Sequence, residues 1–248
     1  MTTEKTEMQF PYSPPDFFEA EYSRQTDEYI LVADSGVVRI TLCVPSDPID
    51  AELQNRITKE VEGLFRVRQL LAHRPFKLNA ASVYQHHSGG TRSISVSAEG
   101  GEFLSLVGQG DFVVRDASGA VKQDTKAERI KAQTEFMDAV MPKLATSATL
   151  NAILESYNAA VADPPNELVH LYEIRDALTD HYGKDDARRR LGISARDWKR
   201  LGALANDAPL KEGRHRGKHS KLRHATPAEL DEARKIAFRL IKAFANQL

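Results

Sequence analysis

The chain has 248 residues, 41% of them hydrophobic and 28% charged, and a formal net charge of −1. This composition is typical of a globular protein, and no apolar run approaches the roughly 20 residues that a membrane-spanning helix needs, so we expect no membrane contact. The single cysteine excludes an intramolecular disulfide and a cysteine-based zinc cluster, and the first residues lack the pattern of a secretory signal. We therefore expect a cytoplasmic protein.

The first half of the chain predicts a tail followed by a β-rich domain. Residues 1–27 are polar and contain prolines, which indicates a flexible N-terminal tail. Residues 28–124 contain short alternating apolar runs separated by glycine-rich turns, a pattern typical of strands. The runs EYILVA and VVRITLCV flank the turn signal DSG, so we expect them to form a hairpin.

One long helix is predicted between these strands, at residues 49–73. Apolar residues such as Ile57 and Leu64 recur there at helical spacing, and Ser46 or Asp47 is placed to cap the helix. Further alternating runs follow at residues 77–85, 91–98, 103–107 and 111–116. We expect these runs to form a meander that packs against the helix.

Strand signals stop near Thr125, and residues 125–248 predict an all-α domain. The predicted helices are residues 126–141, 147–162, 166–182, 184–191, 195–206 and 227–247. The fold class is therefore expected to be α+β, with an N-terminal β-meander and hairpin domain carrying one long helix, and a C-terminal helical bundle.

Familiar cofactor and metal motifs are missing from the sequence. Neither glycine pattern of phosphate and dinucleotide loops occurs, and no zinc-protease or serine-nucleophile motif is present. We therefore expect no cofactor and no metal site.

Residues 186–205, DARRRLGISARDWKRLGALA, resemble a helix-turn-helix. The residues expected to be buried are Ala187, Leu191, Ile193, Trp198 and Leu201. Gly192 would permit a left-handed backbone in the turn, and Arg196, Lys199 and Arg200 would project towards a DNA major groove. A structural helical hairpin within a bundle fits the same pattern, so both interpretations stay open.

The stretch KEGRHRGKHSKLRH, residues 211–224, concentrates positive charge. It holds six Lys or Arg, three His and one Glu, while the rest of the chain has a formal charge of −6. A helix follows whose start is marked by Thr226 as N-cap, Pro227 at the first helical position and Glu229 in a capping box. Because the amino end of a helix favours anions, we predict that this loop faces phosphate groups.

The end of the chain, ALANDAPLKEGRHRGKHSKLRHATPAELDEARKIAFRLIKAF, resembles the HEPN superfamily of helical domains. It is most similar to a bacterial type with a LAND…GRH…EAR pattern that is associated with phage defence or abortive infection. The resemblance covers about the last hundred residues. It implies a bundle of four or five helices, often a homodimer, and in many members a metal-independent endoribonuclease with an Arg–polar–…–His motif.

Carried onto this sequence, the resemblance implies that Arg214 binds phosphate, His215 is its polar neighbour and His219 is the acid–base residue. The accompanying nucleic-acid contacts would be Lys211, Arg216, Lys218, Lys221, Arg223 and the supporting donor Asn206.

A second set within the helical half also fits this motif, in which four to six positions separate the arginine from the histidine. It consists of Arg175, Asp176 and His181. Because the chain has twenty arginines and eight histidines, such spacings arise by chance, and the spacing alone does not distinguish the two sets. Arg175 and His181 are six positions apart on one predicted helix and should point to different faces. The first set is therefore preferred.

The sequence thus favours a protein that acts on nucleic acid, with RNA a better candidate than DNA. The leading hypothesis is a HEPN-like ribonuclease or an inactive relative. The alternatives are a helix-turn-helix regulator that binds DNA, and a structural or assembly protein whose basic loop docks an acidic partner.

Overall fold

The computed structural model of the chain describes residues 3–46, 48–88, 92–95, 111, 113–115, 120–183, 186–218 and 220–248. Residue contacts divide the chain into two compact units. The sheet unit consists of residues 1–68 and 76–138, and the helical unit of residues 69–75 and 139–248. The helical unit therefore resumes at residue 139, fourteen residues beyond the compositional change at Thr125.

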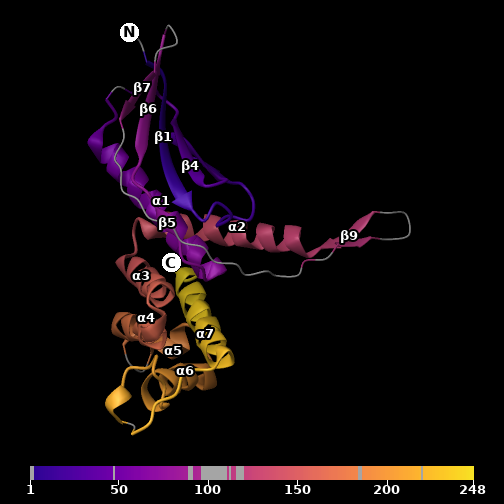
Figure 1. Cartoon of the computed structure of the whole chain (residues 1–248), viewed down its shortest axis with the longest axis vertical. Coiled ribbons are helices and arrows are strands. Elements are labelled where there is room, and N and C mark those ends of the chain that lie inside the picture. The colour runs from indigo at the N-terminus through magenta and orange to yellow at the C-terminus, as the bar shows by residue number, and fades with distance from the viewer. Residues whose placement is uncertain are drawn as a thin grey trace. The chain divides into compact units, whose positions relative to one another are not determined.

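The sheet unit is built on an antiparallel sheet (Figure 1). Among the described residues its strands follow the order β2 (Tyr22–Gln25), β3 (Tyr29–Asp34), β4 (Val37–Leu42), β1 (Thr3–Ser13), β6 (Ser82–His87) and β7 (Arg92–Ser95), and β5 (Lys77–Leu78) also pairs with β1. The mixed architecture, a sheet followed by helices, agrees with the expected α+β class.

The prediction of a flexible tail at residues 1–27 is wrong, because β1 lies at the centre of the sheet. Met8 pairs with Ile40 of β4 on one side and with Val83 of β6 on the other. The buried residues of β1 include the alternating set Thr6, Met8, Phe10 and Tyr12. Lys5, Glu7 and Gln9 alternate with this set and lie on the other face of the strand, where Pro11 is exposed.

The predicted hairpin is confirmed as β3 and β4. Asp34 pairs with Val37, so Ser35 and Gly36 form a two-residue turn. Both have left-handed backbones, with φ of 48° and 87°. Positive φ at both central positions matches the right-handed twist of the strands, which is why the SG pair connects them so tightly.

The predicted long helix is confirmed as α1 (Ala51–Ala72), and its apolar side covers one face of the sheet. Phe65 packs edge-on against Tyr12 at a centroid distance of 5.1 Å and stacks on Phe17 at 5.4 Å. The cap differs from the prediction, because Asp50 Oδ2 accepts the Leu53 N–H at 3.0 Å. Ser46 instead donates its hydroxyl to a nearby backbone carbonyl, and Asp47 lies outside the described residues.

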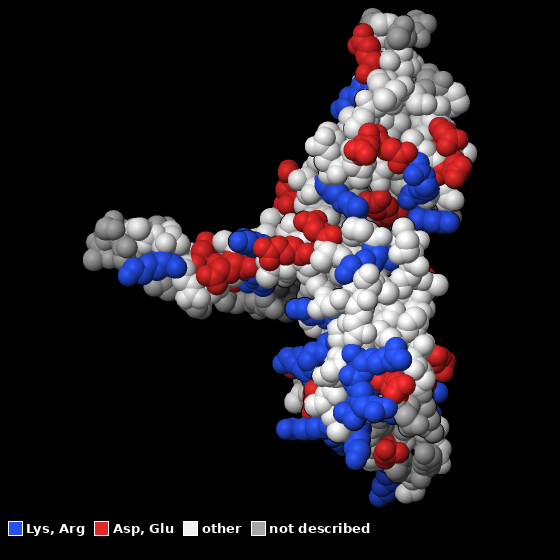
Figure 2. Space-filling model, turned by 180° about the vertical axis from the view of Figure 1, so that it is seen from behind, with Lys and Arg blue, Asp and Glu red and all other residues white. Residues whose placement is uncertain are grey.

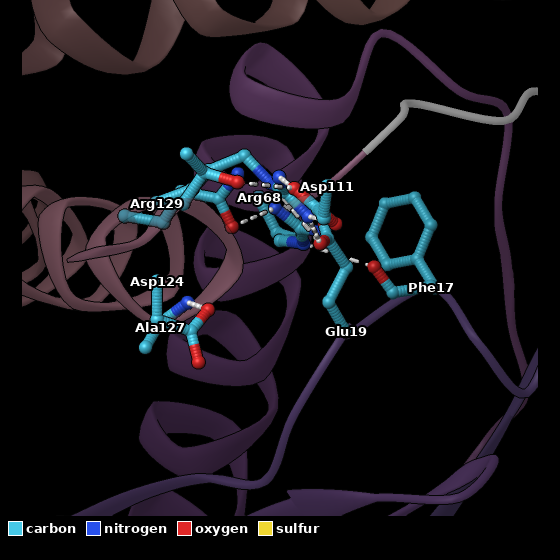
Figure 3. Close-up of polar contacts among 9 residues, drawn as sticks. Phe17, Glu19, Arg68, Asp111, Asp124, Ala127 and Arg129 are labelled. Carbon is cyan, nitrogen blue, oxygen red and sulfur yellow. Dashed lines mark hydrogen bonds and ion pairs between the residues drawn. The ribbon is translucent and has the colours of Figure 1, made fainter. Parts of the chain in front are cut away.

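A buried arginine holds the segment between β1 and β2 in place (Figure 3). Arg68 of α1 donates to the Phe17 carbonyl and to Gln133 Oε1, both at 2.9 Å, and to Glu19 Oε1 at 3.2 Å. Arg129 also donates to Glu19, at 2.6 Å. Although burial opposes the charge, the hydrogen bonds from both arginines lower the pKa of Glu19. These contacts are a second reason why residues 1–27 are not a loose tail.

Among the described residues, only part of the predicted meander belongs to the main sheet. Residues 77–85 and 91–98 contribute β5, β6 and β7, whereas β8 (Val113–Arg115) pairs with β9 (Val121–Asp124) in a separate two-stranded ladder. The predicted run at residues 103–107 lies outside the described residues.

The predicted helices are confirmed in order, although the fourth is shorter than predicted and the fifth ends as an α-helix at Gly202. They are α2 (Thr125–Leu144), α3 (Ala148–Ala162), α4 (Glu167–Tyr182), α5 (Ala187–Arg190), α6 (Ala195–Gly202) and α7 (Pro227–Ala245). In the helical unit α4 packs against both α3 and α7 (Figure 1). Fully buried leucine, isoleucine and phenylalanine side chains of these three helices form the core.

A charged network is buried beside this core. Glu167, at the start of α4 and only 2% exposed, accepts hydrogen bonds from Arg234 of α7. His73 Nδ1 lies 3.0 Å from the Tyr157 hydroxyl, and its Nε2 lies 3.7 Å from Glu167 Oε1. The His73 backbone is left-handed, with φ of 45°.

No helix in the described part of the chain combines the length and the apolar character needed to cross a membrane.

Candidate nucleic-acid interface

The turn between α5 and α6 has the predicted backbone. Gly192 adopts a φ of 64°, a left-handed conformation that L-residues rarely adopt. The Ser194 hydroxyl caps α6 by accepting the Asp197 N–H at 3.0 Å. Helix α5 is a single turn, and a short connection that contains Gly192 joins it to α6.

Four of the five predicted buried residues of this segment are buried: Ala187, Leu191, Ile193 and Leu201. Trp198 is the exception, because it is half-buried. Its ring is covered instead by the guanidinium of Arg175 from α4, whose Cζ lies 4.6 Å from the ring centroid.

The cations of α6 differ in their surroundings. Arg196 and Lys199 are exposed, and no ion pair to either is recorded among the described residues. Arg200, predicted to face a groove, donates its Nε hydrogen to Glu232 of α7 at 2.8 Å. On α6, Arg196 and Lys199 are therefore exposed to solvent, while Arg200 connects α6 to α7.

Helix α6 continues as a π-helical turn, η2 (Ala203–Asp207), from which the basic loop leaves. The Ala205 carbonyl accepts the Arg214 N–H at 2.7 Å. A Cβ on Gly213 would lie 2.9 Å from the same carbonyl oxygen, so only glycine fits without a shift. Asn206, the predicted supporting donor, has a buried Oδ1 without a hydrogen-bond partner among the described residues.

The two ends of the basic loop are joined. The Lys211 N–H donates to the Arg223 carbonyl at 2.9 Å, and the Arg223 N–H donates to the Pro209 carbonyl at 3.0 Å. Glu212, 8% exposed, accepts hydrogen bonds from His224 Nδ1 at 2.8 Å and the Ala225 N–H at 2.9 Å. Although burial opposes the charge, these hydrogen bonds lower the pKa of Glu212. The carboxylate thus fixes the base of the loop.

The loop arginines hold the loop to its surroundings. Arg214 donates to Asp176 Oδ2 of α4 at 2.8 Å. Arg223 donates to both carboxylate oxygens of Glu229, at 2.7 and 2.8 Å. These bonds, together with the capping box of Thr226, lower the pKa of Glu229 to about 2.

Arg216, in the 3₁₀ turn η3 (Arg216–Lys218), makes a similar attachment. Its Nη2 donates to the Pro165 carbonyl at 2.9 Å and to Asn166 Oδ1. The three arginines predicted to contact nucleic acid therefore each have an intramolecular partner.

Other predicted residues of the loop remain on its surface. Lys221 and His215 are exposed, and Lys211 Nζ lies 3.1 Å from His224 Nε2. His219, the expected acid–base residue, and the side chain of Lys218 lie outside the described residues.

The rival set on α4 is not brought together. Arg175 Nη1 donates to the Trp198 carbonyl at 2.9 Å, whereas His181 Nδ1 lies 3.2 Å from the Thr149 hydroxyl of α3. The expected divergence of Arg175 and His181 is therefore present. Asp176 joins the preferred set instead, through Arg214.

Sequence reasoning missed an aromatic and cationic cluster beneath the loop. The Tyr172 ring lies under two guanidinium groups, with the Cζ of Arg175 at 5.0 Å and that of Arg214 at 4.9 Å from its centroid. Gly202 leaves room for Arg175, because a Cβ there would lie 2.5 Å from Arg175 Nη1. Tyr172, Trp198 and the loop arginine come from three separate segments, so no local pattern could reveal the cluster.

Residues 186–248, which include α6 and the basic loop, carry an excess of positive charge. Residues 186–248 contain sixteen Lys or Arg and seven Asp or Glu, a net charge of +9. The remaining residues 1–185 therefore carry −10. Figure 2 shows lysine and arginine side chains clustered over the region of the helical unit.

Among the described residues, no group of three or more His, Cys, Asp or Glu side chains is arranged to hold a metal ion. Comparison with known proteins gives no matching family model, no matching curated protein and no matching solved structure.

Proposed function

We propose that the helical unit binds nucleic acid, with α6 and the loop of residues 211–224 facing the phosphate backbone. One observation carries this proposal: the loop arginines are paired within the unit, while Arg196, Lys199 and Lys221 are exposed. The arginines attach the loop to α4, to the turn before α4 and to α7, and the remaining cations are available to phosphates. A preformed surface loses little conformational entropy on binding.

Each backbone contact releases counterions, so affinity should fall steeply with salt. The experiment measures binding to single-stranded RNA, duplex RNA and duplex DNA of equal length by fluorescence anisotropy over a KCl series. Replacing Arg196 and Lys199 with alanine should weaken binding and reduce the slope of log K against log salt by about 2.

The matched control replaces Lys126 and Lys131, two exposed lysines of α2, with alanine. It changes the net charge equally and should leave the slope unchanged. Equal slopes for both double variants, or no binding by the parent protein at any salt concentration, would contradict the proposal.

As a second candidate function we propose that the chain is a HEPN-like endoribonuclease that acts as a homodimer. Its catalytic site would contain Arg214, His215 and His219. The favouring observation is that Arg214 is held in place by Asp176 and lies beside the exposed His215. RNA incubated with the protein in the presence of EDTA should be cleaved. Cleavage that persists in both Arg214→Ala and His219→Ala would exclude this site.

A further inference from the structure

We propose that an unpaired base of the bound nucleic acid stacks on the guanidinium of Arg214. This inference rests on the proposed nucleic-acid binding and names the class of ligand, which is a single strand, or a loop or bulge in which bases are free. The observations that carry it are the seat of Arg214 on Tyr172, the pairing of Arg214 with Asp176 and the exposure of its side chain.

Arg214 is held at three points. Its backbone N–H donates to the Ala205 carbonyl at 2.7 Å, its Nη1 donates to Asp176 Oδ2 at 2.8 Å, and its Cζ lies over the Tyr172 ring at 4.9 Å. Even so, 36% of the side chain is exposed. The guanidinium is therefore fixed in orientation yet accessible, which lowers the entropic cost of stacking.

The Tyr172 ring that Arg214 contacts is itself packed against a second arginine and a tryptophan. Tyr172 also contacts Arg175, and the Cζ of Arg175 lies 4.6 Å from the ring centroid of Trp198. Arg175 is fastened by a hydrogen bond to the Trp198 carbonyl, and Gly202 leaves it the necessary space. Rings and guanidinium groups from α4, α6 and the loop thus form one set of contacts that ends at the surface with Arg214.

The chemistry of this arrangement suits a base better than a phosphate. An arginine that recognises phosphate uses the N–H groups at its edge, and Asp176 already accepts one of them. The flat face of a guanidinium stacks on nucleobases, which is a recurring mode of recognition for unpaired RNA. In a duplex the bases are stacked on one another, so a duplex cannot use this contact.

The test compares a single strand that carries 2-aminopurine with the corresponding duplex. The parent protein should bind the single strand more tightly and change the fluorescence of 2-aminopurine on binding. Arg214→Lys keeps the charge and the means to pair with Asp176 but lacks the flat face. It should lower affinity for the single strand by about 5- to 100-fold, abolish the fluorescence change and leave duplex binding nearly unchanged.

The matched control is Arg189→Lys of α5, an exposed arginine outside the loop that is likewise paired with an aspartate, Asp186, and it should keep the preference for the single strand. Should Arg214→Lys lower the melting temperature, Tyr172→Leu gives the same comparison with both arginines present. Equal affinity of the parent protein for single strand and duplex, or an unaltered fluorescence change in Arg214→Lys, would overturn the stacking proposal. Failure of the proposed nucleic-acid binding would give a different result. The double variant of Arg196 and Lys199 would then have the same salt slope as the parent protein.

Discussion

Arg234 donates to both carboxylate oxygens of Glu167, through Nε at 2.5 Å and Nη2 at 2.8 Å. The Glu167 side chain is 3% exposed and that of Arg234 31% exposed, so the pair is largely removed from water. Breaking such a pair leaves a buried charge without its partner, which costs far more than losing a surface contact.

Arg234→Met should destabilise the helical unit by about 3 kcal/mol, because the Glu167 carboxylate would remain buried without the two hydrogen bonds from Arg234. The double substitution Arg234→Met with Glu167→Leu should recover most of this loss, since no buried charge then remains. Urea unfolding followed by the fluorescence of Trp198, the single tryptophan, reports on this unit. As a control, Lys235→Met, which removes the exposed pair with Asp231, should cost less than about 1 kcal/mol. Equal losses in the single and double variants would contradict the prediction.

Acid should destabilise the same unit through His73. Burial, assisted by the positive charge of Arg234, lowers the pKa of His73 to about 4. An unfolded histidine titrates near 6.5, so as the pH falls from 6.5 to 4 the unfolded chain takes up a proton that the folded chain does not. The stability from neutral His73 is present above pH 6.5 and should be lost through that window, by about 2–3 kcal/mol.

His73→Asn isolates this effect, because asparagine tolerates the left-handed backbone at that position and does not titrate. Urea unfolding at several pH values should show a weaker loss of stability between pH 6.5 and 4 in the variant. An identical pH dependence in parent and variant would assign the acid sensitivity to other groups.

Two glycines of the basic loop offer a matched comparison. Gly213→Ala places a Cβ 2.9 Å from the Ala205 carbonyl oxygen, and backbone cannot move aside as a flexible side chain can. We expect a loss of stability of about 1–3 kcal/mol and weaker nucleic-acid binding, because the loop must shift from the π-helical turn. Gly217→Ala meets nothing within 4 Å and should be nearly neutral. Thermal melts of both variants, followed by anisotropy measurements, test this; equal behaviour would contradict it.

The start of α7 depends on its cap. The Thr226 hydroxyl accepts the Glu229 N–H at 3.2 Å, and the Glu229 side chain accepts the Thr226 N–H at 2.9 Å. Thr226→Ala should therefore cost about 1 kcal/mol, whereas Thr226→Ser should preserve the cap. Chemical denaturation measures both, and the prediction fails if serine is as destabilising as alanine.

Features set by neighbouring residues could be predicted from the sequence. The hairpin follows from the Ser35-Gly36 turn, and the start of α7 follows from its capping box, because both depend on residues a few positions apart. The burial of Leu191 and Ile193 could be predicted for the same reason.

Features that depend on contacts between distant residues could not be predicted from the sequence. The place of β1 depends on pairing with β4 and β6. Strand β4 begins more than twenty residues after the end of β1, and β6 begins more than seventy residues after the start of β1. The role of the loop arginines depends on Asp176 and Asn166, which the fold brings to them from α4 and the turn before it. A count of charges shows that the loop is basic, but it cannot show which cations are already paired.

The central position of β1 also has a consequence for synthesis of the chain. Met8 pairs with Val83, 75 positions later, so ribosomes adding about 5–20 residues per second need several seconds to complete the sheet. During that time β1 can pair with β4 but has a free edge on its other side. Unpaired edges invite association with other chains, so a nascent chain that pauses before residue 82 should be the most aggregation-prone form of this protein.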